Sequence, residues 1–136
     1  MSSCRQTAAR MVAPGKGILA ADESIGTMSA RLEKAGVEAT AENRRIYREL
    51  LSATPGLADG ASGIIFCDET LGQTFGDGTP FARAVHALGI LPGIKVDTGA
   101  KPCPGLSGET VTEGLDGLPG RLAHYAEIGA AFAKWR

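Results

Sequence analysis

Charged side chains follow each of four short apolar runs in this sequence of 136 residues. The runs span residues 17–21, 63–67, 90–96 and 130–133. In a parallel α/β sheet, the loops that leave the carboxyl ends of the strands converge and form the site. A single charge there can simply be leaving the core for water, but charges after four successive runs favour a shared site. These charged residues are Asp22, Glu23, Asp68, Glu69, Lys95, Asp97, Lys134 and Arg136.

The lysines in this set could perform chemistry on a carbonyl group. Side chains alternate between the two faces of a strand, so Phe132 and Lys134 share a face, as Ala20 and Asp22 do. The outer face of a barrel packs on helices and must be apolar, so the charged faces are expected to point inward. An amine held among apolar groups near another cation loses proton affinity and can then attack a carbonyl. Lys95 and Lys134 are the candidates, and we expect both to share one cavity with Asp22.

Ser24, Thr27 and Arg31 come directly after the first run. Ser24 and Thr27 are expected to begin a helix, whose free N–H groups favour an anion. Together with Lys95 they could hold a phosphate. Ordinary capping of the helix by Ser24 or Thr27 is the alternative that the pattern leaves open. The sequence has no Walker loop, and residues 14–17 (PGKG) are expected to turn the chain into the first strand.

Helical patterns separate the four runs. We predict a short helix or turn over residues 6–13 and helices over 27–35, 41–53, 79–88 and 118–128, with Thr40 as an N-cap and a helix end at Gly36. In the third helix, Ile46, Leu50 and Ala53 form an apolar stripe expected to face the core. Its arginines, Arg44, Arg45 and Arg48, are expected to lie on a solvated face. Pro92 predicts that the third strand begins at Gly93, and residues 101–108 are expected to form a loop.

Alternating strands and helices predict an α/β fold with a parallel sheet. Four such units fit either a complete small doubly wound sheet or about the first four βα units of a (β/α)8 barrel, whose full form needs about 250 residues. No linker or low-complexity stretch interrupts the sequence, so residues 1–136 are expected to form a single unit with no internal boundary.

Composition argues against several classes of protein. The formal net charge is -1, so the composition lacks the excess of Lys and Arg typical of proteins that bind nucleic acid. No apolar run approaches the about 18 residues that cross a bilayer, and the N-terminus has no apolar signal core, so a cytoplasmic location is expected. The three cysteines and two histidines lie far apart and lack the spacing of metal ligands. We therefore expect neither a metal site nor a cofactor.

Five stretches of the chain resemble the class I fructose-bisphosphate aldolases, in family order and with family spacing. The two longest and most unusual are residues 12–24 (VAPGKGILAADES) and 132–136 (FAKWR). The others are residues 42–47 (ENRRIY), 93–97 (GIKVD) and 112–118 (TEGLDGL). The resemblance covers nearly the whole chain and implies the N-terminal half of the family's barrel. It also implies cleavage of fructose 1,6-bisphosphate to dihydroxyacetone phosphate and glyceraldehyde 3-phosphate through a protonated Schiff base, in glycolysis and gluconeogenesis, without metal.

The resemblance implies roles for individual residues. Asp22 matches the aspartate that contacts the Schiff-base nitrogen and the reacting hydroxyls, and Lys134 matches a lysine that stabilises charge during imine formation. The expected substrate-binding residues are Ser24, Thr27 and Lys95 at the distal phosphate, Arg31 at a substrate phosphate, and Arg44 and Arg136. A homotetramer, common in the family, is implied for the full barrel.

The chain also departs from the family pattern. Ala30 replaces a lysine that usually precedes the arginine at position 31, which removes a positive charge near the phosphate. The family's Schiff-base lysine comes from a later strand and is expected to be absent here. Two alternatives therefore stay open: a catalytically inactive half-barrel that binds a sugar phosphate or a partner chain, and a small lyase whose imine forms on Lys134. Half a barrel would leave open strand edges, so we expect the isolated chain to be poorly stable or to self-associate.

Overall fold

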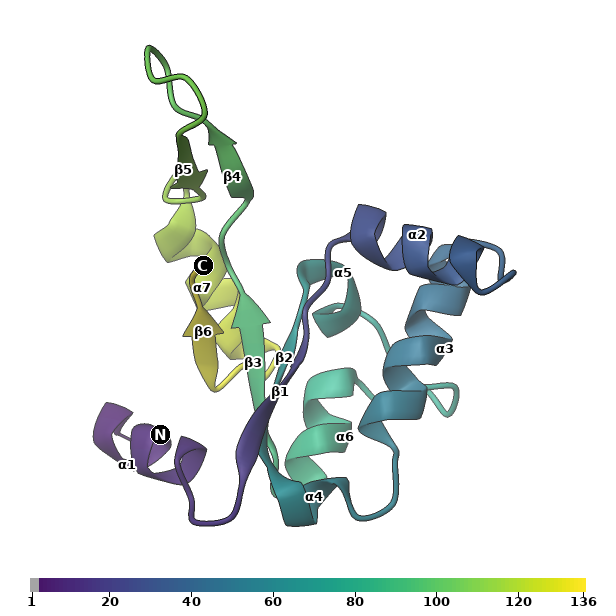
Figure 1. The fold of residues 1–136 in the computed structure, drawn as a ribbon. Coiled ribbons are helices and arrows are strands. Elements are labelled where there is room, and N and C mark those ends of the chain that lie inside the picture. The colour runs from purple at the N-terminus through teal and green to yellow at the C-terminus, as the bar shows by residue number, and fades with distance from the viewer. Residues whose placement is uncertain (1–2) are drawn as a thin grey trace.

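A computed structural model describes residues 3–136, and its centre is a parallel sheet of four strands. The strands are β1 (Gly17–Ala21), β2 (Ala61–Phe66), β3 (Leu91–Lys95) and β6 (Phe132–Lys134), in the order β1-β2-β3-β6. The α/β prediction with a parallel sheet is confirmed. All residues of the inner strand β2 are buried, as expected of a strand covered on both sides. The edge strands β1 and β6 have no second partner strand in the described part of the chain (Figure 1).

Helices connect the strands as the sequence pattern predicts. They are α1 (Cys4–Met11), α2 (Ile25–Lys34), α3 (Ala41–Ser52), α6 (Phe81–Ala87) and α7 (Leu118–Glu127), with short turns α4 (Leu57–Gly60) and α5 (Asp68–Leu71). Thr40 caps α3 by accepting a hydrogen bond from the N–H of Asn43 at 3.1 Å. Gly36 follows α2 with a φ of 74°, which only glycine adopts without strain. In the described chain, no helix is long and apolar enough to cross a membrane.

One local prediction was wrong, and one hairpin was missed. Pro92 lies inside β3, because its carbonyl still accepts a hydrogen bond from Ala131 at 2.7 Å and its ring removes only one donor. The expected loop at residues 101–108 is largely present, since residues 103–108 lie outside any strand, but it joins two strands that the sequence reading missed. These strands, β4 (Gly99–Pro102) and β5 (Thr110–Glu113), form an antiparallel hairpin that projects beyond β3 (Figure 1). The β-branched residues of β5 (Thr110, Val111, Thr112) were the available signal.

The core lies between the sheet and the helices α5, α6 and α7. Phe81 is fully buried, and its ring meets those of Phe66 and Phe75 edge-on at centroid distances of 5.5 and 4.7 Å. Such edge-to-face pairs are favourable because the positive ring edge meets the negative face. This cluster packs α6 against Phe66, the last residue of β2, and so supports the carboxyl end of that strand.

The predicted orientation of α3 was also wrong. Ile46 and Leu50 are 47% and 68% exposed. The buried residues of α3 are instead Arg44, Arg48 and Ser52, which recur every four residues on the opposite face. The two arginines can be buried because carboxylate and carbonyl oxygens from other segments accept their hydrogen bonds.

Candidate functional site

A pocket of about 350 Å³ opens at the carboxyl ends of the strands. It draws on β1 and the segment after it, α2, β3, β6 and the C-terminal residue. Its lining residues are Ala20, Asp22, Glu23, Ser24, Thr27, Arg31, Lys95, Lys134 and Arg136. Seven of the eight residues predicted for the site are among them, and the eighth, Arg44, is not. The convergence rule for parallel sheets therefore located this cavity correctly.

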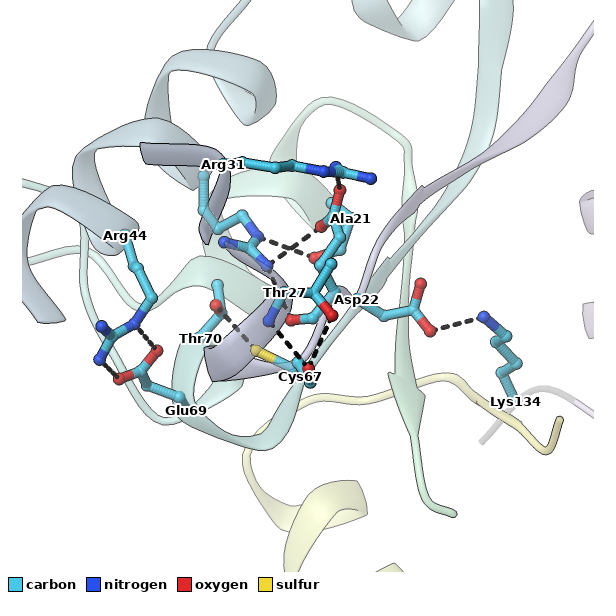
Figure 2. Close-up of polar contacts among 12 residues, drawn as sticks. Ala21, Asp22, Thr27, Arg31, Arg44, Cys67, Glu69, Thr70 and Lys134 are labelled. Atoms are coloured by element: carbon cyan, nitrogen blue, oxygen red, sulfur yellow. Dashed lines mark hydrogen bonds and ion pairs between the residues drawn. The ribbon is translucent and has the colours of Figure 1, made fainter. Parts of the chain in front are cut away.

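An ion pair between Asp22 and Lys134 crosses the pocket. Lys134 Nζ donates a hydrogen bond to Asp22 Oδ2 at 2.6 Å, and the side chains are 36% and 9% exposed (Figure 2). These residues follow β1 and end β6, the two outer strands of the sheet. In a flat sheet, three strand spacings of about 4.8 Å would separate them by roughly 14 Å. Only a sheet that curves toward the pocket brings them into contact, as in a barrel wall.

Lys95 lies at the end of β3 and is held by Asp97. Its Nζ is 3.1 Å from both Asp97 Oδ1 and the Asp97 carbonyl oxygen. Burial alone would raise the pKa of Asp97, but the hydrogen bond and charge of Lys95, the N–H of Gly99 and the charge of Arg136 together lower it. Asp97 is thus a carboxylate at neutral pH, and its contacts hold the Lys95 side chain beside the pocket.

The N-terminus of α2 forms another part of the wall. Ser24 caps the helix by accepting a hydrogen bond from the N–H of Thr27 at 3.2 Å, and the two hydroxyl oxygens lie 3.0 Å apart. Capping and a place in the pocket are therefore compatible. Arg31, one turn further on, forms an ion pair with Glu23 and keeps 56% of its side chain exposed. Its guanidinium thus lies at the pocket wall with more than half of the side chain open to solvent.

The charges of the pocket favour an anionic ligand. Four cationic side chains line it, against the two carboxylates of Asp22 and Glu23. The helix N-terminus adds partial positive charge on the same side. A phosphate-bearing ligand fits this balance.

Arg44 lies elsewhere, on the far side of α2. Its guanidinium donates to both carboxylate oxygens of Glu69, at 2.9 and 2.6 Å, and the pair is separate from the Asp22–Lys134 pair (Figure 2). Arg44 also donates to Ser29 and to the carbonyl of Ala39. The geometry therefore gives Arg44 a structural partner and leaves it out of the pocket lining. The contact of Arg44 with substrate that the resemblance implies stays a prediction. Glu69 is likewise committed to α3 and does not join the charges at the strand ends.

The Arg44–Glu69 pair predicts how stability depends on pH. The hydrogen bond from Arg44 lowers the pKa of Glu69, against an opposing effect of burial. A carboxylate with a lowered folded-state pKa adds stability above its unfolded pKa of about 4.3 and loses it as the pH falls through the folded-state value. Glu69→Gln is therefore expected to flatten the fall in the free energy of unfolding between about pH 5 and pH 3. Urea unfolding at several pH values measures this, with Glu109→Gln on the exposed hairpin loop as the control. An unchanged pH dependence in Glu69→Gln would count against the pair.

Sequence reasoning placed Glu23 among the charges at the strand ends without giving it a role, and it did not connect Arg48 with the site. Glu23 lines the pocket and pairs with Arg31 and Arg48. Arg48, expected on a solvated face, has a side chain only 1% exposed. The burial of Arg48 had a signal in retrospect, since Arg44, Arg48 and Ser52 recur every four residues on one face of α3.

Comparisons with known proteins agree with this geometry. The family described as glycolytic, fructose-bisphosphate aldolase class-I, matches residues 3–136. A protein named probable fructose-bisphosphate aldolase class 1, from Xanthomonas campestris pv. campestris, is 58% identical over 131 residues, which are 96% of this chain and 39% of that protein. Fructose-bisphosphate aldolase C of Carassius auratus is 57% identical over 130 residues, 95% of this chain and 36% of that protein.

A solved structure is similar as well. It is the fructose-bisphosphate aldolase of Plasmodium falciparum in a ternary complex with TRAP and a small-molecule inhibitor. It aligns with a TM-score of 0.92 and 48% identity, over 96% of this chain and 38% of that one. The present chain thus spans less than two fifths of the length of these relatives and corresponds to part of their fold. On this evidence of sequence and structure, the chain belongs to the class I fructose-bisphosphate aldolase family.

Proposed function

We propose that this chain supplies the N-terminal half of the active site of a class I fructose-bisphosphate aldolase. Such an enzyme is a carbon–carbon lyase that cleaves fructose 1,6-bisphosphate through a protonated Schiff base. The observation that carries the proposal is the Asp22–Lys134 ion pair at 2.6 Å inside a pocket with surplus positive charge. The pocket thus has an amine in contact with a carboxylate, next to cationic groups that could bind a phosphate. This arrangement suits a reaction in which protons are transferred on a sugar phosphate.

Seven of the nine lining residues have a role in this proposal. Asp22 contacts the Schiff-base nitrogen and the reacting hydroxyls, and Lys134 stabilises the charge that develops during imine formation. The distal phosphate is bound by Lys95, by the hydroxyls of Ser24 and Thr27, and by Arg31, while Arg136 contacts the substrate. The imine itself forms on a lysine from later strands of the barrel, outside this chain.

A chimaera tests the proposal. Residues 1–136 would replace the matching segment of the Xanthomonas campestris relative, which then supplies the rest of the barrel. We expect the chimaera to cleave fructose 1,6-bisphosphate, with triose phosphates detected by a coupled assay. A chimaera that folds, judged by circular dichroism and a cooperative melt, yet shows no cleavage would rule the proposal out.

Lys95 should be needed mainly for binding the phosphate. Lys95→Met removes a charge-assisted hydrogen bond worth about 1.5–3 kcal/mol, so the Kd of glyceraldehyde 3-phosphate should rise about 10- to 100-fold. Titration calorimetry of the chimaera measures it. Lys101→Met, on the exposed β4 strand, is the matched control and should bind as the parent does. Equal affinity in both variants would place the phosphate elsewhere.

A second candidate is a catalytically inactive half-barrel that binds a sugar phosphate. It is favoured by one observation: the groups proposed for the distal phosphate all line one pocket of this chain. An experiment on the chain alone distinguishes an inactive half-barrel from a small lyase. The chain is treated with dihydroxyacetone phosphate and borohydride, and any adduct is located by peptide mapping. No adduct with retained phosphate binding supports the inactive half-barrel. An adduct on Lys134 supports the chain as a small lyase.

A further inference from the structure

Arg48 is a buried cation placed directly behind the pocket. Its Nε donates to the carbonyl oxygen of Ala21 at 2.9 Å, and its Nη2 donates to the carbonyl oxygen of Glu23 at 3.0 Å. The same Nη2 lies 3.1 Å from Glu23 Oε2. An arginine this deeply buried is costly unless its donors are satisfied. Here Nε and Nη2 donate to two carbonyls and one carboxylate, all from a single segment of the chain.

The two carbonyls lie on either side of Asp22. The pairing of β1 with β2 ends at Ala21 opposite Phe66, so Asp22 and Glu23 continue beyond the sheet. Because peptide groups are planar, each held carbonyl fixes the orientation of a whole peptide plane. Holding the carbonyls of Ala21 and Glu23 therefore restricts the φ and ψ dihedrals of the backbone between them, at Asp22 and Glu23. Arg48 therefore replaces the missing sheet partner where Asp22 leaves the strand and fixes the direction of its side chain toward Lys134.

The carboxylate of Glu23 extends the same arrangement to the phosphate side. Glu23 binds Arg48 through Oε2 and Arg31 through Oε1. One buried guanidinium thus orients both Asp22 and the partner of Arg31.

We propose that Arg48 is a positioning residue of this site, which holds the segment 21–23 so that Asp22 meets Lys134. What the site then catalyses rests on the proposed function, but the positioning does not. A site whose support is loosened by about 1 Å can lose on the order of 100-fold in rate.

Amine labelling of the 136-residue chain tests the positioning without any substrate. Brief acetylation, mapped by mass spectrometry, gives a rate for each lysine. The acetylation rate of Lys134 reports whether its bond to Asp22 is intact. The rate of Lys16 reports whether the fold is intact, because its Nζ donates to the carbonyl of Ala58 at 2.6 Å. Arg48→Lys should raise the rate at Lys134 about two- to fivefold, as expected for a weakened ion pair, and leave Lys16 unchanged. The matched control is Arg45→Lys, whose ion pairs with Glu42 and Glu49 lie on another face of α3.

Each outcome decides the proposal. An unchanged rate at Lys134 in Arg48→Lys overturns it. If Lys16 and Lys134 become reactive together, in Arg48→Lys and in the larger change Arg48→Met, Arg48 serves only the fold and the proposal is also overturned. In the active chimaera, Arg48→Lys should lower kcat about 100-fold with a smaller change in KM, because Lys95, Ser24 and Thr27 remain in place to bind the phosphate. A chimaera without activity, combined with the selective change at Lys134, would refute the proposed function and leave the positioning role standing.

Discussion

Replacing Lys134 with methionine is expected to lower kcat of the chimaera by about 10²- to 10⁴-fold, the range typical for losing a group that assists proton transfer or charge in the transition state. Methionine is close to lysine in length but carries no charge, so Asp22 loses its partner at 2.6 Å while the pocket keeps its shape. Binding of glyceraldehyde 3-phosphate should change far less than kcat, because Lys95, Ser24 and Thr27 remain. Steady-state cleavage of fructose 1,6-bisphosphate and a calorimetric titration measure the two effects.

The two members of the pair should act as a unit. Asp22→Asn is expected to cause a loss similar to that of Lys134→Met, and the double variant should lose little more than either single one, since coupled groups are non-additive. Lys16→Met is the control, because Lys16 bonds to a backbone carbonyl far from the pocket. Fully additive losses would show that the ion pair has no shared role, and a kcat within threefold of the parent in Lys134→Met would remove Lys134 from the mechanism.

The place of the site was predictable because it depends on a rule of topology. Charged residues after apolar runs mark the carboxyl ends of strands, and parallel strands bring those ends together. Asp22, Lys95 and Lys134 are far apart in sequence yet line one pocket. The rule needs only the order of elements and the period of each strand, which the sequence contains.

The orientation of α3 was not predictable in the same way. Its apolar residues and its arginines each follow a helical period, so periodicity alone supports two opposite faces. Hydrophobicity favours burying Ile46 and Leu50, which the structure exposes. The other face is buried because Glu69 and the end of β1 offer acceptors to Arg44 and Arg48. Those acceptors lie 25 and 27 residues away in sequence, and no local pattern announces them.

The position of Arg44 was also not predictable from a local sequence pattern. Its match to a family motif suggested contact with substrate, yet a motif fixes residue types and not the direction of a side chain. The bidentate pair with Glu69 satisfies much of its fork of donors. Position within a motif and position within a pocket are thus separate properties, and only the fold decides the second.

Stability measurements can distinguish the buried core from the exposed apolar stripe of α3. Phe81→Ala is expected to lower the free energy of unfolding by about 3–5 kcal/mol, because it removes a fully buried ring and leaves a cavity between Phe66 and Phe75. Since small domains are stable by only about 5–15 kcal/mol, this one change should unfold a large share of the molecules under mild denaturant. Urea titrations followed by circular dichroism, at one protein concentration for all variants, give the difference.

Leu50→Ala is the matched comparison, since it also truncates an apolar side chain on a helix. Leu50 is 68% exposed, so the loss should stay within about 0.5 kcal/mol. A cost near that of Phe81→Ala would mean that the apolar stripe of α3 is buried after all. Arg48 would then face solvent, and its bonds to the segment around Asp22 could not form, so this comparison also tests the geometry on which the site depends.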